Sequence, residues 1–325
     1  MPVSDTYQGT VVTDPYRWLE TPTAESAEVK GFIDAQNAYA RAFLAALPER
    51  TAVKTRLAEI LGAATVGYGA LDEVKGQLYA LKLEPPKAQR MIVVMPGPDK
   101  PGEERVVVDP NVIDPSGKTA IDWYHVSPDG KLVAVSLSAG GSETGDVHVF
   151  ETATGKQVFE VVPGVNAGTA GGDLEWLAGS NGGLLMGAVV TQRPDLFAAV
   201  SSYVGIYDML RVETEPNGAF NVPEFGTVTD PAQFAALYAY SPYHHVVDGT
   251  KYPPTLFLVG DNDVRVASWH SRKMVARLQA AAGDAAPHLL VTSFDAGHGI
   301  GSSVQQTVEQ NADGFGFLLH YLAAP

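Results

Sequence analysis

The chain has 325 residues, of which 45% are hydrophobic and 18% are charged, and this ordinary globular composition excludes an intrinsically disordered protein. The sequence contains 22 Lys and Arg residues and 37 Asp and Glu residues, and the resulting net charge of −15 argues against binding to nucleic acid or to an anionic membrane surface. The absence of cysteine excludes disulfides, thiolate metal sites and a cysteine nucleophile.

The sequence also bears on location. The first residues, MPVSDTYQGT, lack the basic and apolar regions of a signal peptide, and no apolar run approaches the roughly 20 residues that span a bilayer. We therefore expect a soluble, cytoplasmic protein. A periplasmic location is the alternative if the true N-terminus lies upstream of this sequence.

The sequence pattern of residues 1–65 predicts helices. The segment Asp34–Leu47 is rich in Ala and Leu, Pro48 restarts the chain, and Thr51–Leu61 continues a helical pattern. We predict that this helical segment packs on the C-terminal part of the chain, residues 171–325.

Residues 66–170 change to short β-rich runs separated by turn signals such as Pro128-Asp129-Gly130. The predicted strands are Gln77–Leu83, Arg90–Met95, Arg105–Val108, Leu132–Leu137, Val147–Phe150 and Gln157–Val162. The alternation of strand, turn and strand is typical of a propeller blade, so this region is predicted to be a partial β-propeller of one to two blades.

Residues 171–325 alternate strands with helices, which predicts an α/β domain around a parallel sheet. The predicted strands are Leu174–Leu177, Ala198–Tyr203, Thr255–Val259 and His288–Phe294, and the predicted helices are Leu184–Thr191, Ser268–Ala282 and Val304–Leu322.

The first candidate for chemistry is Ser180, in the loop Gly-Ser-Asn-Gly-Gly between a predicted strand and a predicted helix. A serine at such a turn exposes its Oγ at the top of the sheet, and small neighbours relieve the crowding. The usual G-x-S-x-G signature fails here because Ala178 takes its first position. Taken alone, the loop is more often a plain turn.

Two further candidates follow predicted strands. Asp263 stands in VGDNDVRV, where an acid can orient a histidine or cap a helix, and Asp261 competes for the same role. His298 stands in DAGHGIG, and its glycine neighbours let the ring approach another loop. We interpret the other candidate histidines as helix-surface residues, His270 and His320, or as a loop, His244-His245.

The order Ser180, Asp263, His298 is the chain order of α/β-hydrolases. It predicts that His298 takes the proton of Ser180 and that Asp263 holds the imidazole. The backbone N–H of Asn181 would be one oxyanion donor.

These residues lie in segments that resemble the prolyl oligopeptidase family of serine peptidases over nearly the whole chain. The matching segments are TDPYRWLE (Thr13–Glu20), AQN (Ala35–Asn37), SPDGKLVAVSLSAGGSE, GSNGGLLMGAVVTQRPDLF, VGIYDML, FGTVTDP, LYAYSPYHHV, DNDVRV and DAGHGIG. The resemblance implies an α/β-hydrolase-like catalytic part, joined to a truncated β-propeller-like part, that cleaves short peptides after proline through an acyl-enzyme.

The resemblance also implies roles for single residues. Ser180 matches the nucleophile, Asp263 rather than Asp261 matches the acid, and His298 matches the general base. Two further matches concern substrate binding. Arg265 matches the arginine that contacts the carbonyl groups of the substrate. The hydrophobic residues around the proline-binding pocket are matched by Ile206, Phe225 and Val266.

The chain departs from the family pattern in length. Most of the propeller and the first half of the hydrolase sheet, with the tyrosine that completes the oxyanion hole, have no counterpart, as if deleted internally. The tryptophan that stacks on the substrate proline in that family would fall near Phe220-Asn221, and no tryptophan stands there.

These departures leave two alternatives open beside the peptidase: a hydrolase of small esters or amides, and a catalytically impaired remnant of the family. We expect a short peptide as partner, no cofactor, no metal, no nucleic acid and no membrane. A propeller that cannot close leaves strand edges through which a homodimer can form.

Overall fold

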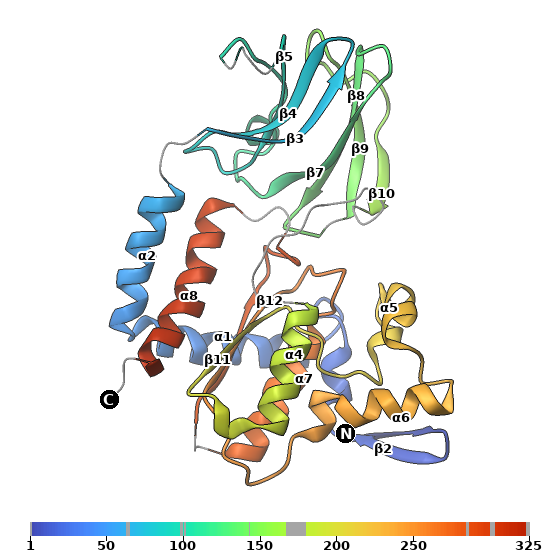
Figure 1. Ribbon diagram of the computed structural model, residues 1–325, viewed down its shortest axis with the longest axis vertical. Helices are drawn as coiled ribbons and strands as arrows, with labels where there is room; N and C mark the ends of the chain where they lie inside the picture. The colour runs from blue at the N-terminus through green and yellow to red at the C-terminus, as the bar shows by residue number, and fades with distance from the viewer. Residues whose placement is uncertain are drawn as a thin grey trace. The chain divides into compact units, whose positions relative to one another are not determined.

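The structure is a computed structural model that describes residues 2–62, 66–97, 100, 102–142, 144–166, 180–283, 286–299 and 303–322. Internal contacts divide the chain into two units (Figure 1). The first unit comprises residues 1–53, 175–294 and 310–325, and the second comprises residues 54–174 and 295–309. Within the described ranges, none of the helices combines the length and the apolar character needed to cross a bilayer.

The first unit opens with a β-hairpin of β1 (Val3–Tyr7) and β2 (Thr10–Asp14). Its two-residue turn holds Gln8 and Gly9 at positive φ, which matches the right-handed twist of the strands. The prediction of a helical segment is therefore wrong for its first residues, because β-branched residues and a turn outweigh the helix formers that follow.

Helices do follow the hairpin, as predicted. They are η1 (Arg17–Glu20), α1 (Ala27–Ala45) and α2 (Pro48–Leu61). The hydroxyl of Ser26 caps α1 by accepting a hydrogen bond from the Val29 N–H, and Pro48 starts the next helix, as expected from a ring that fixes φ.

The described part of the central sheet is parallel, as predicted, with the order β11 (Val200–Tyr203), β12 (Thr255–Gly260) and β13 (His288–Ser293). It is covered on both faces by helices α4 (Asn181–Gln192), α7 (Trp269–Ala282), α1 and α8 (Val304–Leu322) (Figure 1). Alternate side chains of β12 pack on opposite faces of the sheet. Phe257 packs with Met274 of α7, and Leu256 packs with Leu44 of α1.

The segment between β11 and β12 holds short elements. These are η4 (Val212–Thr214), α5 (Gly218–Phe225), α6 (Pro231–Tyr240) and η5 (Pro242–His245), and η3 (Pro194–Leu196) precedes β11. His244 and His245 therefore end a short 3-10 helix rather than lying in an irregular loop. The predicted strand Leu174–Leu177 lies outside the described residues.

The second unit holds two antiparallel sheets, each of four strands among the described residues. The first has the order β3 (Gly67–Val74), β4 (Gln77–Leu83), β5 (Met91–Met95), β6 (Arg105–Val108). After the short helix α3 (Pro110–Ile113), β7 (Thr119–Val126), β8 (Leu132–Ala139), β9 (Thr144–Glu151) and β10 (Val162–Asn166) form the second. Sheets of this size are the repeating blade of a propeller, which confirms the predicted fold class.

One apolar cluster joins the two sheets of the second unit. It includes Tyr79 and Ile92 from the first sheet and Val133 and Phe150 from the second. The hydroxyl of Tyr79 also donates a 2.9 Å hydrogen bond to the carbonyl of Gly130, in the turn between β7 and β8. The two sheets therefore share a core rather than standing as separate ribbons.

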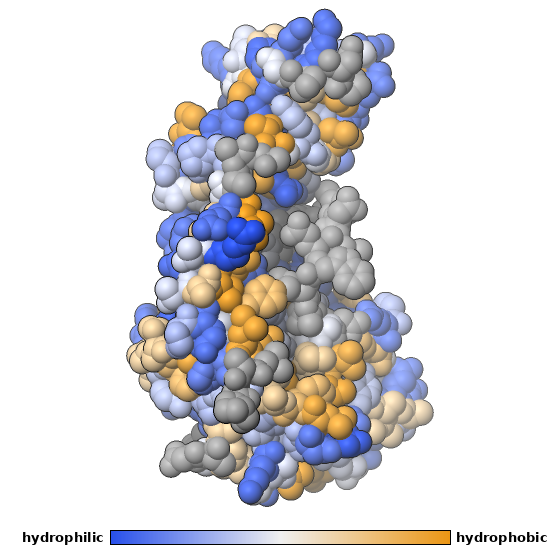
Figure 2. All heavy atoms as spheres, turned by 60° about the vertical axis from the view of Figure 1, so that its left-hand side comes forward, coloured by the Kyte–Doolittle hydropathy of each residue, from blue (hydrophilic) through white to orange (hydrophobic). Residues whose placement is uncertain are grey.

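The outer strands differ from the prediction. Strands β3 and β7 were not predicted, because polar and aromatic residues interrupt their alternation. The predicted strand Gln157–Val162 is wrong: only Gln157 forms a bridge there, and β10 begins at Val162. Phe159, in the bend before β10, is 58% exposed, and the homodimer through strand edges stays a prediction. Apolar side chains also reach the surface as scattered patches among polar ones (Figure 2).

Candidate active site

Ser180 has a strained backbone immediately before helix α4. Its φ is +56°, a region that residues with a side chain seldom occupy. Its N–H donates hydrogen bonds to the carbonyls of Tyr203 and Val204, at the carboxyl end of β11. Val204 is itself at φ +41°. Two strained residues are thus tied together where the sheet meets the helix, which is the turn geometry expected of an exposed nucleophile.

The glycines after Ser180 allow close packing of α4 on the sheet. A Cβ on Gly183 would lie 2.4 Å from the Cα of Gly205, and a Cβ on Gly187 would lie 2.7 Å from the ring of Tyr207. No side chain fits at such distances, so only glycine lets the helix start this close to the end of β11. The backbone N–H of Asn181, the first residue of α4, lies outside the intrahelical hydrogen-bond ladder and is of the type that serves as an oxyanion donor.

Asp263 follows the carboxyl end of the neighbouring strand β12. The residue is 9% exposed, and its Oδ1 accepts hydrogen bonds of 2.9 Å from the backbone N–H groups of Arg265 and Val266. The carboxylate is thereby fixed within its own loop. Asp261, the competing candidate, is used elsewhere: its Oδ1 accepts from Thr23 and from the guanidinium of Arg272.

The residues predicted to bind the substrate side chain lie in one apolar cluster. Ile206 and Val266 are 3% and 4% exposed and belong to the same group of buried residues, and Phe225 packs against that group. Residues far apart in the sequence therefore line one hydrophobic region next to the Asp263 loop.

The structure does not bring all the predicted catalytic residues into one unit. Ser180, Asp263 and Arg265 belong to the first unit, whereas His298, which follows β13, belongs to the second. Within the first unit, Ser180 and Asp263 lie at or after the carboxyl ends of β11 and β12, the end of the sheet where α/β proteins carry their chemistry, and His298 follows β13 in the sequence. The assembled triad stays a prediction.

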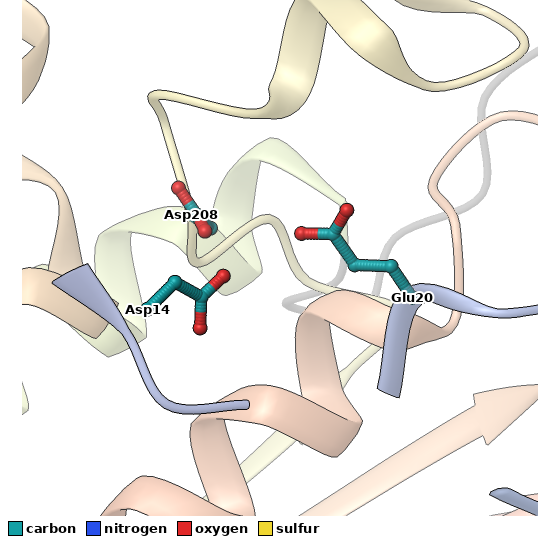
Figure 3. Close-up of side chains that lie close together, drawn as sticks. All are labelled: Asp14, Glu20 and Asp208. Atoms are coloured by element: carbon teal, nitrogen blue, oxygen red, sulfur yellow. The ribbon is translucent and has the colours of Figure 1, made fainter. Parts of the chain in front are cut away.

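A second cluster of charged residues was not predicted. The carboxylates of Asp14, Glu20 and Asp208 converge within 4.8 Å of one another, from the end of β2, from η1 and from the segment after β11 (Figure 3). The ammonium of Lys273 lies 2.6 Å, 2.8 Å and 2.6 Å from their oxygens. This lysine supplies the positive charge that a metal ion would otherwise supply.

Further groups complete this cluster. Arg17 donates to Asp14, and Arg211 donates to Glu20, so three cations meet three carboxylates. The Lys273 side chain is fully buried, and its ammonium also lies 4.8 Å from the centre of the Tyr243 ring. The cluster ties the N-terminal segment to α7 and to the segment after β11.

The pKa of Asp14 predicts a loss of stability in acid. Burial alone would raise this pKa, but the Lys273 ammonium and the hydrogen bonds from Lys273 and Tyr243 lower it from 3.8 to about 2. A lowered carboxyl pKa contributes stability that is present above pH 4 and is lost as the pH falls through about 2. The shift corresponds to about 2 kcal/mol. Urea unfolding between pH 4 and pH 2 measures it. Asp14→Asn should flatten this dependence, and an unchanged slope would contradict the assignment.

His270 corrects another interpretation. It was expected on a helix surface, but its side chain is fully buried. The sequence pattern gives no sign of this burial, because residues 269–276 of α7 are all buried, the polar ones included. His320 is 39% exposed on α8, in keeping with a surface position.

Two family models match this chain. The family model for the prolyl oligopeptidase N-terminal beta-propeller domain matches residues 2–184, and the model for the prolyl oligopeptidase family matches residues 176–325. A prolyl endopeptidase of Elizabethkingia miricola is 44% identical over 142 residues, covering 43% of this chain and 20% of that protein. Prolyl oligopeptidase A of Amanita bisporigera is 33% identical over 201 residues, covering 58% of this chain and 26% of that protein.

Solved structures are similar in fold. A structure from a study of two prolyl endopeptidases matches with a TM-score of 0.87 at 18% identity and covers 99% of both chains. Prolyl oligopeptidase B from Galerina marginata, bound to a 35mer substrate, matches with a TM-score of 0.83 at 13% identity, covering 99% of this chain and 98% of that one. The chain spans about a fifth to a quarter of the length of the curated relatives it matches. Because the two family models together span nearly the whole sequence, the chain belongs to the prolyl oligopeptidase family.

Proposed function

We propose that this chain is a serine peptidase that cleaves short peptides after proline, with Ser180 as nucleophile. The observation that carries the proposal is the backbone of Ser180, held at positive φ between the end of β11 and the start of α4 in a chain of this family. Strained residues that the surroundings over-determine concentrate at functional sites.

The proposed reaction has two stages. In the first, His298 takes the proton of the Ser180 hydroxyl as the oxygen attacks the carbonyl carbon of the substrate. The Asn181 N–H stabilises the resulting oxyanion, and His298 gives the proton to the departing amine. In the second, water attacks the acyl-enzyme with the same base and releases the acid product. Asp263 holds the imidazole throughout.

Substrate selection is proposed to rest on the apolar region formed by Ile206, Phe225 and Val266. A hydrophobic pocket distinguishes side chains by about 1–3 kcal/mol, so peptides with proline before the scissile bond should react about tenfold to 200-fold faster than alanine counterparts. Matched chromogenic peptides measure this ratio as kcat/KM.

Phe225 and Phe159 provide a matched pair for this test. Phe225 packs against the buried cluster, whereas Phe159, in the second unit, is 58% exposed. Phe225→Ala should reduce the preference for proline by about tenfold, and Phe159→Ala should leave it unchanged. Equal rates for proline and alanine peptides in the unaltered chain would contradict the proposed specificity.

That outcome would favour the second candidate, a hydrolase of small esters or amides. One observation points that way. Asn221, near the position where the family carries its proline-stacking tryptophan, donates a 3.3 Å hydrogen bond to Glu215 and so offers an amide in place of an aromatic face. Rapid turnover of small acyl esters without proline preference would identify this activity.

A further inference from the structure

His270 is fixed by the segment that follows β11. It lies in the first turn of α7 with a fully buried side chain. The backbone N–H groups of Tyr207 and Asp208 donate to its Nδ1, at 3.2 Å and 3.1 Å. A nitrogen that accepts two hydrogen bonds carries its lone pair, so the ring proton of a neutral His270 sits on Nε2.

The other ring nitrogen faces a buried carboxylate. Nε2 of His270 lies 3.6 Å from Oε1 of Glu215, and it has no hydrogen-bond partner within the described ranges. The Glu215 side chain is 1% exposed. A buried N–H without a partner costs free energy, and a carboxylate at this distance offsets part of that cost.

Glu215 connects this histidine to the loop of Asp263. Its Oε2 accepts a 2.6 Å hydrogen bond from the N–H of Ala267. Ala267 directly follows Val266, whose own N–H binds the carboxylate of Asp263. A series of polar contacts, all buried except the part-buried bond between Glu215 and Ala267, therefore runs from the segment after β11, through His270 and Glu215, to the loop that carries Asp263.

We propose that Glu215 and His270 are positioning residues that hold the loop 261–268, and with it Asp263, in place for catalysis. The inference rests on the proposed function, in which Asp263 is the acid. The two residues touch no reacting atom. They act through Ala267, because displacement of a catalytic group by about 1 Å can cost on the order of a hundredfold in rate.

Two variants remove the connection with little change in volume. Glu215→Gln removes the charge and sets an amide against the Nε2–H of His270. His270→Asn keeps an oxygen acceptor where Nδ1 stands but loses the group that faces Glu215. In both we expect backbone hydrogen exchange in peptides covering residues 261–268 to rise at least about tenfold. In Glu215→Gln a single oxygen is left for the Ala267 N–H and for the Nε2–H of His270, and in His270→Asn the Glu215 carboxylate is no longer held from the side of His270.

His288 provides the control. It is also buried, its Nδ1 lies 2.9 Å from the hydroxyl of Thr255, and its Nε2 has no hydrogen-bond partner within the described ranges. His288 is the first residue of β13, so it lies at the amino end of the parallel strands, whereas the Asp263 loop follows their carboxyl end. His288→Asn should therefore lower the melting temperature without accelerating exchange in residues 261–268.

The kinetic arm uses a fluorophosphonate probe on the full chain. Both variants should lower the maximal rate of inactivation about tenfold to a hundredfold and change the half-saturating probe concentration by less than about twofold, whereas His288→Asn should change neither. Unchanged exchange in residues 261–268 would overturn the proposal, and so would accelerated exchange with an unchanged inactivation rate. If the unaltered chain does not react, the proposed function fails, and the exchange measurement alone decides whether the pair holds the loop.

Discussion

Ser180→Ala is expected to lower kcat/KM for a proline-containing peptide by roughly four to six orders of magnitude, because loss of a serine nucleophile removes the covalent pathway altogether. The alanine keeps the small volume that the crowded turn requires, so the fold should be retained. The N–H at position 180 can still bind the carbonyls of Tyr203 and Val204. Equal melting temperatures with lost turnover would assign the chemistry to the hydroxyl.

Ser26 is the matched control serine. Its hydroxyl caps α1, so Ser26→Ala should cost about 1 kcal/mol of stability and leave turnover unchanged. Substantial turnover in Ser180→Ala would contradict the assignment, because some other residue would then perform the reaction.

Lys273→Met is expected to destabilise the protein by about 3–5 kcal/mol, because it leaves buried carboxylates without their cation. The ammonium of Lys273 binds Asp14, Glu20 and Asp208, and burial of its side chain is complete. Methionine fills a similar volume, so the loss reports charge rather than a cavity. Urea unfolding at pH 7 measures the change.

The control for this charge is Lys30→Met. Lys30 forms an ion pair with Asp34 at 2.7 Å on the exposed side of α1, and both side chains are 53% exposed. Such surface pairs contribute less than about 0.5 kcal/mol. Similar losses in the two variants would show that the buried cluster has no special role in stability.

Much of the fold follows from the sequence. The run Thr255–Val259 is apolar without alternation, which is typical of a parallel strand covered on both faces, and β12 fulfils this through Leu256 and Phe257. The bounds of β4, β6 and α8 agree with their predicted ranges. By contrast, β3 contains Gly67 and Gly69 with several polar residues, so its sequence does not show the alternation of a strand. Pairing with β4 stabilises it as a strand.

The candidate site is predictable only in part. Ser180 and Asp263 stand out because each lies at or after a strand end in a short polar loop. Glu215, His270 and Lys273 do not, because a charged residue in a helix or turn usually faces solvent. Their burial depends on partners distant in sequence: Asp14 lies 259 residues from Lys273, and Ala267 lies 52 residues from Glu215. Sequence patterns of local period carry no trace of such contacts.

The central claim, that Ser180 is the nucleophile of a serine peptidase, is tested most directly by fluorophosphonate labelling of the purified chain, with the modified residue located by mass spectrometry. We predict one label per chain, on Ser180, and none in Ser180→Ala. A cooperatively folded sample that takes up no label, or that carries it on another residue, would contradict the claim.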